Sequence, residues 1–151
     1  MVKTLSNNRQ AKFNYEAKDT YLAGIALIGR ETKPVRNGEI DLKGSFVTLK
    51  DGEAYLTNAH IKPYRFAKED PSYDPNRSRK LLLNKSEIQK LIAAKQNGLT
   101  IVPLSVELHG RFIKVKIATA KGKKLFDKRQ TIQKRDTDRE TERNVKNRAR
   151  L

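Results

Sequence analysis

Apolar and polar residues alternate over short stretches of this chain, as they do in β-strands that bury one face. The clearest example surrounds Asp51-Gly52, a dipeptide that tolerates positive φ at both of its positions. Residues 45–50 and 53–56, on its two sides, contain β-favouring side chains. We therefore predict a β-hairpin over residues 45–56.

A second hairpin is predicted over residues 99–118, with His109-Gly110 as its turn. Because side chains alternate between the two faces of a strand, its second half divides into an apolar and a basic face. The face that we expect to be buried carries Ile113, Val115 and Ile117. The face that we expect to be open to water carries Lys114 and Lys116.

The remaining strand signals are more scattered. Residues 21–29 form a nearly continuous apolar run, which predicts a buried strand. Phe13 and Tyr15 alternate with polar neighbours, so order is expected to begin near Phe13, after a flexible segment over residues 1–12. Residues 61–66 add a strand that Pro63 places at an edge, and residues 68–79 are predicted to be a loop.

One clear helix and one or two lesser helices are predicted. In the clearer one, Asn84 caps the first turn, Glu87 completes a capping box, and Gly98 follows the end. Its buried stripe consists of Ile88, Leu91 and Ile92. A shorter helix is predicted over residues 30–38, with Pro34 in its first turn and Gly38 closing its end.

These elements indicate a mainly β protein in which short antiparallel strands curl into a small barrel, flanked by two or three helices. A chain of 151 residues with 36% hydrophobic content suits one such domain, which we assign to residues 1–126. Residues 127–151 are assigned to a separate basic tail.

The distribution of charge along the chain sets residues 121–151 apart from the rest. The net charge is +16, and residues 121–151 contribute +7 of it through twelve Lys and Arg against five Asp and Glu. The few apolar residues in the tail cannot form a buried stripe. We expect the tail to be disordered when free and to become helical against a polyanion, for which nucleic acid is favoured over a membrane surface.

No stretch approaches the ~18 to 20 apolar residues of a membrane-spanning helix, and the first residues lack the apolar core of a signal peptide. The sequence has no cysteine, which agrees with a reducing compartment. We therefore expect a cytoplasmic protein, and we expect it to be a monomer.

Candidate catalytic chemistry is sparse. The two histidines, His60 and His109, are interpreted as ordinary surface or turn residues. We find no phosphate-loop, zinc-protease or dinucleotide motif in the sequence. The sequence thus predicts no catalytic residues, no metal site and no cofactor.

Basic residues interleaved with aromatic ones are what RNA binding requires, since phosphates take Lys and Arg while unpaired bases stack on flat side chains. Three patches fit: one at Asn8, Arg9 and Lys12, one over residues 77–84, and one joining Lys116 to residues 121–129. Phe126, in the third patch, is expected either to contact RNA or to fold back onto the barrel.

Several motifs together resemble the SsrA-binding protein (SmpB) family. The resemblance is carried by Asn8-Arg-Gln-Ala-Lys-Phe-Asn-Tyr, Ala23-Gly-Ile-Ala-Leu-Ile-Gly, Asp51-Gly-Glu-Ala-Tyr-Leu, Asp74-Pro-Asn-Arg-Ser-Arg-Lys-Leu-Leu-Leu-Asn-Lys and Ala120-Lys-Gly-Lys-Lys-Leu-Phe-Asp-Lys-Arg. These motifs follow the family's order over nearly the whole chain.

The resemblance implies an oligonucleotide-binding-like (OB-like) β-barrel that binds the tRNA-like domain of transfer-messenger RNA in trans-translation. It also implies that the tail forms a helix in the empty mRNA channel of a stalled ribosome, near the decoding centre. Together, the patches and the resemblance predict RNA contacts at Asn8, Arg9, Lys12, Lys33, Arg36, Arg77, Arg79, Lys80, Asn84, Lys116, Lys121, Gly122, Lys123, Lys124 and Phe126. The predicted ribosome-binding residues of the tail are Asp127, Lys128, Arg129, Lys134, Arg135, Arg139 and Arg143.

The chain departs from the family pattern at three places. Family members commonly have a glutamate, counted among the RNA contacts, where this chain has Leu22. They commonly have Glu-Val-Lys-Ser where this chain has Glu31-Thr-Lys-Pro, and an aromatic residue near Ser105-Val-Glu.

The leading hypothesis is a noncatalytic RNA-binding adaptor for ribosome rescue. A structural ribosomal protein would share the basic barrel and tail, and an RNA-processing enzyme would need an acid/base pair that we cannot identify in the sequence.

Overall fold

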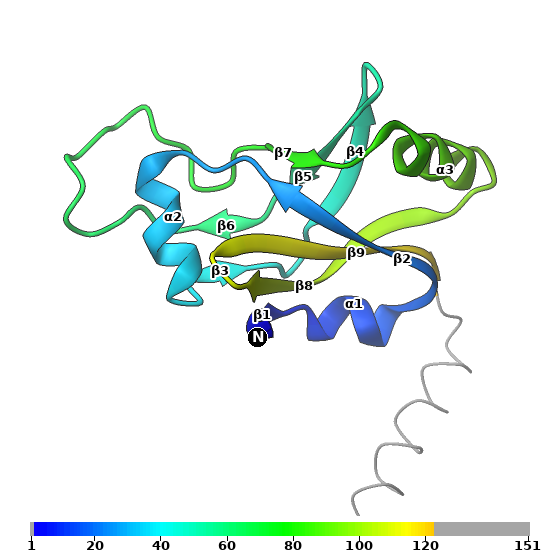
Figure 1. Cartoon of the computed structure of the whole chain (residues 1–151), viewed down its shortest axis with the longest axis horizontal. Coiled ribbons are helices and arrows are strands. Elements are labelled where there is room, and N and C mark those ends of the chain that lie inside the picture. The colour runs from blue at the N-terminus through cyan, green and yellow to red at the C-terminus, as the bar shows by residue number, and fades with distance from the viewer. Residues whose placement is uncertain (1, 123–151) are drawn as a thin grey trace, which may run out of the picture.

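The computed structural model describes residues 2–122, which form three helices and nine strands (Figure 1). The helices are α1 (Arg9–Asn14), α2 (Gly29–Arg36) and α3 (Lys85–Gln96). The strands are β1 (Val2–Asn7), β2 (Tyr15–Ile25), β3 (Ile40–Asp41), β4 (Phe46–Lys50), β5 (Glu53–Thr57), β6 (His60–Ile61), β7 (Arg79–Leu82), β8 (Thr100–His109) and β9 (Phe112–Gly122).

Seven strands form one antiparallel sheet in the order β1-β8-β9-β2-β7-β5-β4, and β3 pairs with β6 separately. The predicted mainly β, antiparallel fold with few helices is confirmed. Within residues 2–122, no hydrogen-bonded pairing joins the two end strands, β1 and β4.

Both predicted hairpins are present. Between β4 and β5, Asp51 and Gly52 have φ of 52° and 74°, as the predicted turn requires. The β8–β9 turn lies one residue later than predicted, because His109 pairs with Phe112 and is the last residue of β8. Gly110, with φ of 62°, and Arg111 therefore form this turn.

Helix α3 is capped as predicted. The Asn84 side chain accepts a hydrogen bond from the backbone N–H of Glu87 at 2.8 Å, and the Glu87 carboxylate accepts one from the N–H of Asn84 at 3.2 Å. Ile88 and Leu91 are buried, and Ile92 packs at the edge of the core.

Helix α2 begins at Gly29, so Pro34 lies inside the helix and not in its first turn, which corrects the prediction. Proline has no N–H to donate to the carbonyl group of Arg30, four residues earlier. The backbone N–H of Tyr64 takes that place, at 2.9 Å from the Arg30 oxygen. Because Pro34 cannot donate to it, the Arg30 carbonyl oxygen is available to bind the Tyr64 N–H, and this hydrogen bond ties residues 62–66 to α2. Gly38, with φ of 79°, follows the helix end as predicted.

The predicted flexible segment over residues 1–12 is wrong. Residues 2–7 form β1, which pairs with β8 from Val2 opposite His109 to Asn7 opposite Ser105. Phe13, predicted in a strand, lies in α1. The sequence gives little sign of β1, because four of its six residues are exposed and its pairing partner lies about a hundred residues away.

Two other strand predictions also need correction. The predicted buried strand over residues 21–29 is the second half of β2, which ends at Ile25, and only Ala23 and Gly24 of β2 are buried. The strand predicted over residues 61–66 is limited to β6, since the segment after Ile61 forms turns and packs along α2.

The main core joins β2, β4, β5, β7, β8 and β9 to α2 and α3. On the other face of β8 and β9, Ala11 of α1 packs against Val102 and Ala120 in a small second cluster. Helix α1 therefore covers one end of the sheet, whereas the middle of β2 and β9 on the same face stays open (Figure 1). Among the helices of residues 2–122, none is long and apolar enough to cross a membrane.

Candidate nucleic-acid interface

The neighbouring strands β2 and β7 place two leucines, Leu22 and Leu82, as an apolar strip on the open side of the sheet, beside β9. Leu22 of β2 pairs with Lys116, while Gly24 pairs with Lys114 on one side and with Leu82 of β7 on the other. Directly paired residues share a face, so these side chains lie together. Leu22 is 42% exposed and Leu82 is 54% exposed, although both lie in the middle of a sheet.

Lysines edge this strip. Lys116 is exposed and Lys114 is half-buried, and neither makes an ion pair with any residue from 2 to 122. Lys80 lies two residues before Leu82 and so shares its face, and its ammonium nitrogen is 3.8 Å from a carboxylate oxygen of Glu53. We call this surface the central face; it comprises Leu22, Gly24, Lys80, Leu82, Lys114 and Lys116.

Gly24 shapes the central face. A Cβ atom at this position would lie 3.1 Å from the Cβ atom of Leu82, which is closer than side chains ordinarily approach. The glycine therefore lets Leu82 lie across β2. The result is an exposed apolar ridge with cations on both sides, which can bury sugar or base surface while the lysines meet phosphates.

A buried ion cluster beneath the surface fixes the geometry of α2 and β7. Glu31, in the first turn of α2, is fully buried, and so is Arg79 at the start of β7. Arg79 donates from Nε to the Glu31 carboxylate at 2.9 Å, and Arg77 donates from its own Nε at 3.1 Å. Each arginine also donates from Nη2: Arg77 thereby bridges both carboxylate oxygens, whereas both donors of Arg79 meet the same oxygen, Oε2.

Backbone groups and Tyr73 provide further hydrogen bonds to Glu31 and Arg79. The backbone N–H of Ile28 donates to Glu31 at 3.1 Å, and Arg79 donates to the carbonyl oxygen of Ala59 at 2.6 Å. The Tyr73 hydroxyl lies 3.0 Å from Glu31 and 2.9 Å from the carbonyl oxygen of Ile61. The cluster therefore joins α2, β6, the loop before β7 and β7 itself.

The pKa values follow these contacts. Burial raises the pKa of Glu31, but the hydrogen bonds from Arg77, Arg79 and the Ile28 N–H together outweigh burial and lower it below its ordinary value. Burial and the hydrogen bond to Glu31 raise the pKa of Tyr73. Glu31 is thus an anion that stabilises two arginines at neutral pH.

The prediction that Arg79 contacts RNA is wrong, and the same prediction for Arg77 applies only to the part of its side chain that is exposed. The Arg79 side chain was predicted to touch RNA, but it is 0% exposed and its donors are taken by Glu31 and backbone oxygens. Arg77 is partly exposed, yet it also points to Glu31. Both arginines position α2 and β7 next to the central face.

Asn8 is also buried, which corrects its assignment as an RNA contact. Its side-chain amide donates to the carbonyl oxygens of Pro103 at 2.9 Å and Leu42 at 3.3 Å, and its oxygen accepts from the N–H of Ala11 at 3.1 Å. Asn8 thus caps α1 and ties it to the sheet.

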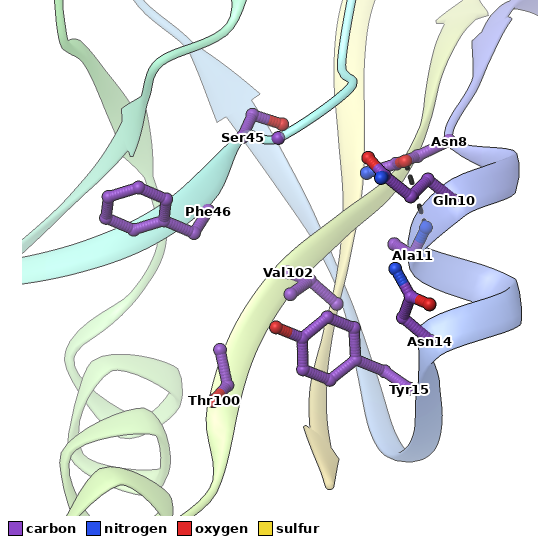
Figure 2. Close-up of a pocket in the computed structure, with 10 residues that line it drawn as sticks. Asn8, Gln10, Ala11, Asn14, Tyr15, Ser45, Phe46, Thr100 and Val102 are labelled. Atoms are coloured by element: carbon purple, nitrogen blue, oxygen red, sulfur yellow. Dashed lines mark hydrogen bonds between the residues drawn. The ribbon is translucent and has the colours of Figure 1, made fainter. Parts of the chain in front are cut away.

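Helix α1 forms a hollow with β4 and β8 (Figure 2). Its volume is about 310 Å³. Tyr15 and Phe46 contribute rings, and Gln10 and Asn14 contribute amides. No residue that lines this hollow carries a charge, so it offers no counter-charge to a phosphate.

The other predicted contacts are spread over the surface. Arg9 and Lys12 are exposed on α1, Lys33 and Arg36 are exposed on α2, and Lys121 and Gly122 are exposed at the end of β9. Asn84 is exposed, but its side-chain oxygen caps α3. The structure brings only Lys80 and Lys116 of the predicted set onto the central face. Outside the described residues lie Lys123, Lys124, Phe126, Asp127, Lys128, Arg129, Lys134, Arg135, Arg139 and Arg143.

Sequence reasoning named neither Leu82 nor Lys114 as an individual site residue, although the basic patch over residues 77–84 includes Leu82. Lys114 was predicted to face water together with Lys116, and that prediction was its signal. Leu22 was singled out only because family members commonly have a glutamate at its position, and its place beside Leu82 appears only once β2 is known to pair with β7.

Fold and surface together define a class: a small, basic, β-rich protein whose open sheet face suits a polyanion with apolar parts. The family model described as "SmpB protein" matches residues 5–147. An SsrA-binding protein of Trichodesmium erythraeum is 48% identical over 145 residues, which cover 95% of this chain and 93% of the relative. An SsrA-binding protein of Thermosynechococcus vestitus is 46% identical over 148 residues, which cover 97% of each chain.

A solved structure described as "tmRNA-SmpB: a journey to the center of the bacterial ribosome" is similar with a TM-score of 0.65 and 45% sequence identity. The match covers 79% of this chain and 84% of that chain. The chain belongs to the SmpB family, which confirms the resemblance seen in the sequence motifs.

Proposed function

We propose that this protein is a noncatalytic RNA-binding adaptor of trans-translation. It binds the tRNA-like domain of transfer-messenger RNA and delivers that RNA to stalled ribosomes in the cytoplasm. The observation that carries the proposal is the central face, a lysine-edged apolar ridge on a member of a family whose relatives are SsrA-binding proteins. The matching solved structure, whose description names tmRNA, SmpB and the ribosome, supports the same partners.

On the central face, the lysines and leucines have separate tasks. Lys80, Lys114 and Lys116 contact phosphates, and these contacts give affinity that falls as salt rises. Leu22 and Leu82 contact ribose or base surface, and this contribution is insensitive to salt. Family members commonly contact RNA through a glutamate at the position of Leu22. In this protein the contact at that position is apolar instead.

The curled sheet serves as an OB-like barrel in this proposal. Its support is that β4, one end of the sheet, lies beside β8, which is not its neighbour in the strand order. The sheet thus curves back on itself, although among residues 2–122 no pairing joins β1 to β4, as in partly open OB-like barrels.

Residues 127–151 act as a separate arm that orders as a helix in the mRNA channel of the ribosome. The dense positive charge of residues 121–151 supports this role, because ribosomal RNA is the polyanion such a segment would meet. The boundary at residue 126 separates the RNA-binding domain from this arm.

Truncation after Arg129 tests the division. The shortened protein should bind the tRNA-like domain nearly as well as the full chain, while rescue of stalled ribosomes should be lost. A fall of roughly an order of magnitude in RNA affinity, equivalent to about 1.4 kcal/mol, would contradict the boundary.

Two further measurements address the proposed partners. Affinity for the tRNA-like domain should exceed affinity for an RNA duplex of equal length, and equal affinities would contradict specific recognition. The protein should sediment with stalled ribosomes; stoichiometric association with all ribosomal subunits would instead indicate a structural ribosomal protein.

A further inference from the structure

A second basic surface, made of other residues than the central face, lies between α2 and residues 62–66. Here a hollow of about 460 Å³ is lined by Lys33, Glu39, Lys62, Tyr64, Arg65 and Phe66, together with Asn37 and Pro63. We call it the α2 hollow. It shares no residue with the central face, and of its residues only Lys33 was predicted to contact RNA.

The wall of the α2 hollow is held in place by backbone contacts. The N–H of Tyr64 donates to the Arg30 carbonyl oxygen that Pro34 leaves without its helical partner. The N–H of Ala67 donates to the Tyr64 oxygen at 2.9 Å, which closes a turn around Phe66. An Arg30 side-chain nitrogen also donates to the carbonyl oxygen of Lys68 at 3.3 Å. The segment is therefore anchored to α2 on both sides of Phe66.

This turn presents an aromatic ring to solvent. Phe66 is 70% exposed, the highest value among the large hydrophobic residues that the structure exposes. Its ring meets Tyr64 edge to face, with 5.3 Å between centroids and an interplanar angle of 72°. The Arg65 guanidinium lies 4.7 Å from the Phe66 centroid, and the Lys33 ammonium lies 5.2 Å from that of Tyr64. Phe66 as a whole therefore stays mostly exposed even with these two neighbours at its ring.

The charge of the α2 hollow is strongly positive. Lys33, Lys62 and Arg65 line it against one acidic residue, Glu39. None of these three cations forms an ion pair with another residue of the described part of the chain. The hollow thus combines an open stacking surface with cations whose charge is not neutralised.

We propose that the α2 hollow binds one unpaired ribonucleotide, with its base stacked on Phe66 and its phosphate held by Lys33, Lys62 and Arg65. Stacking on an aromatic ring beside cations is how proteins hold single-stranded nucleic acid, and the volume lies in the usual range for small-ligand sites. The proposal rests on the proposed function only in taking RNA as the partner. It adds a second RNA contact beyond the central face.

The first experiment uses the full chain and a fluorescent single-stranded octauridylate. Phe66→Ala should weaken binding about tenfold, since stacking contributes roughly 1 to 3 kcal/mol per base. The matched control is Phe112→Ala: Phe112 is 60% exposed, lies 5.5 Å beneath the Arg111 guanidinium, and is outside the hollow. An affinity of Phe66→Ala equal to that of the wild-type chain would overturn the proposal.

Crosslinking separates the hollow from other RNA-binding surfaces, including the basic tail. An octauridylate carrying 5-iodouridine should crosslink to Phe66 or Tyr64 upon irradiation. Crosslinks confined to Phe112 or to residues beyond 122 would overturn the proposal. An acidic octapeptide of equal charge that competes for the hollow as tightly as unlabelled octauridylate would do the same, because it would indicate a site for polyanions without base stacking.

A last comparison identifies the source of the nucleotide. If the tRNA-like domain of transfer-messenger RNA supplies it, saturation with that domain should abolish crosslinking at the hollow. If another RNA supplies it, such as ribosomal RNA, crosslinking should persist in the complex. Failure of the protein to bind the tRNA-like domain would contradict the proposed function, whereas failure of the Phe66 experiments contradicts only the second contact.

Discussion

Replacing Glu31 by glutamine should remove a large part of the stability of this fold. Glutamine keeps the shape of the side chain but has no charge, and Arg79, which is 0% exposed, would keep a buried guanidinium with only neutral acceptors. Removing one partner of a buried ion pair typically costs about 3 to 5 kcal/mol. Because domains of this size have total stabilities of about 5 to 15 kcal/mol, Glu31→Gln should be severely destabilised.

Urea unfolding followed by circular dichroism measures this loss. With a dependence of about 2 kcal/mol per molar urea, the midpoint of Glu31→Gln should fall by roughly 2 M. The control is Glu53→Gln, which removes the partner of Lys80 from a half-exposed pair with 3.8 Å between charged atoms. Its midpoint should shift by less than about 0.5 M, because exposed pairs contribute little. A Glu31→Gln midpoint as close as that to wild type would refute the reasoning.

The same variant tests the pKa of Glu31, which lies below its ordinary value of 4.5. A lowered folded-state pKa means that the carboxylate stabilises the fold fully above its unfolded-state pKa, and that this stabilisation is lost as pH falls through the folded-state pKa. Between about pH 5 and pH 3, wild type should therefore lose more stability than Glu31→Gln. Equal losses in the two proteins would mean that Glu31 does not carry this pH dependence.

Two other substitutions test how the N-terminal part is held to the sheet. Asn8→Ala should lower stability by about 2 kcal/mol, because it removes the α1 cap and the amide hydrogen bonds that tie α1 to the buried carbonyl oxygens of Pro103 and Leu42; the dependence of RNA binding on salt should stay unchanged, and a reduced salt slope would restore Asn8 as an RNA contact. Gly38→Ala should cost at least about 1 kcal/mol, since Gly38 has φ of 79° and an added Cβ would lie 2.9 Å from the Leu5 carbonyl oxygen; a thermal melt equal to that of wild type would contradict the close contact with β1.

Elements with local chemical signals could be predicted from the sequence. The β4–β5 hairpin depends on Asp51 and Gly52, and the start of α3 depends on Asn84 and Glu87, so each signal lies within the element itself. The family could be predicted for the same reason, because its motifs are contiguous stretches of sequence.

What could not be predicted depends on partners far apart in the chain. Arg79 belongs to a basic run that resembles a surface patch, but Glu31, 48 residues earlier, draws it into the interior. The ridge of the central face forms only because β2 lies between β7 and β9. Likewise, residues 62–66 lie along α2 because Pro34 frees a carbonyl oxygen that Tyr64 can reach.

The central claim is that leucines and lysines of one sheet face bind the tRNA-like domain of transfer-messenger RNA through different physical contributions. The most direct test measures the affinity of wild type, Leu82→Ala and Lys116→Ala for that domain over a range of salt concentrations, with Lys90→Ala on the exposed side of α3 as the control. Lys116→Ala should reduce the slope of log affinity against log salt by about one, whereas Leu82→Ala should lower affinity at every salt concentration without changing the slope. If neither variant differs from Lys90→Ala, the central face is not where this RNA binds.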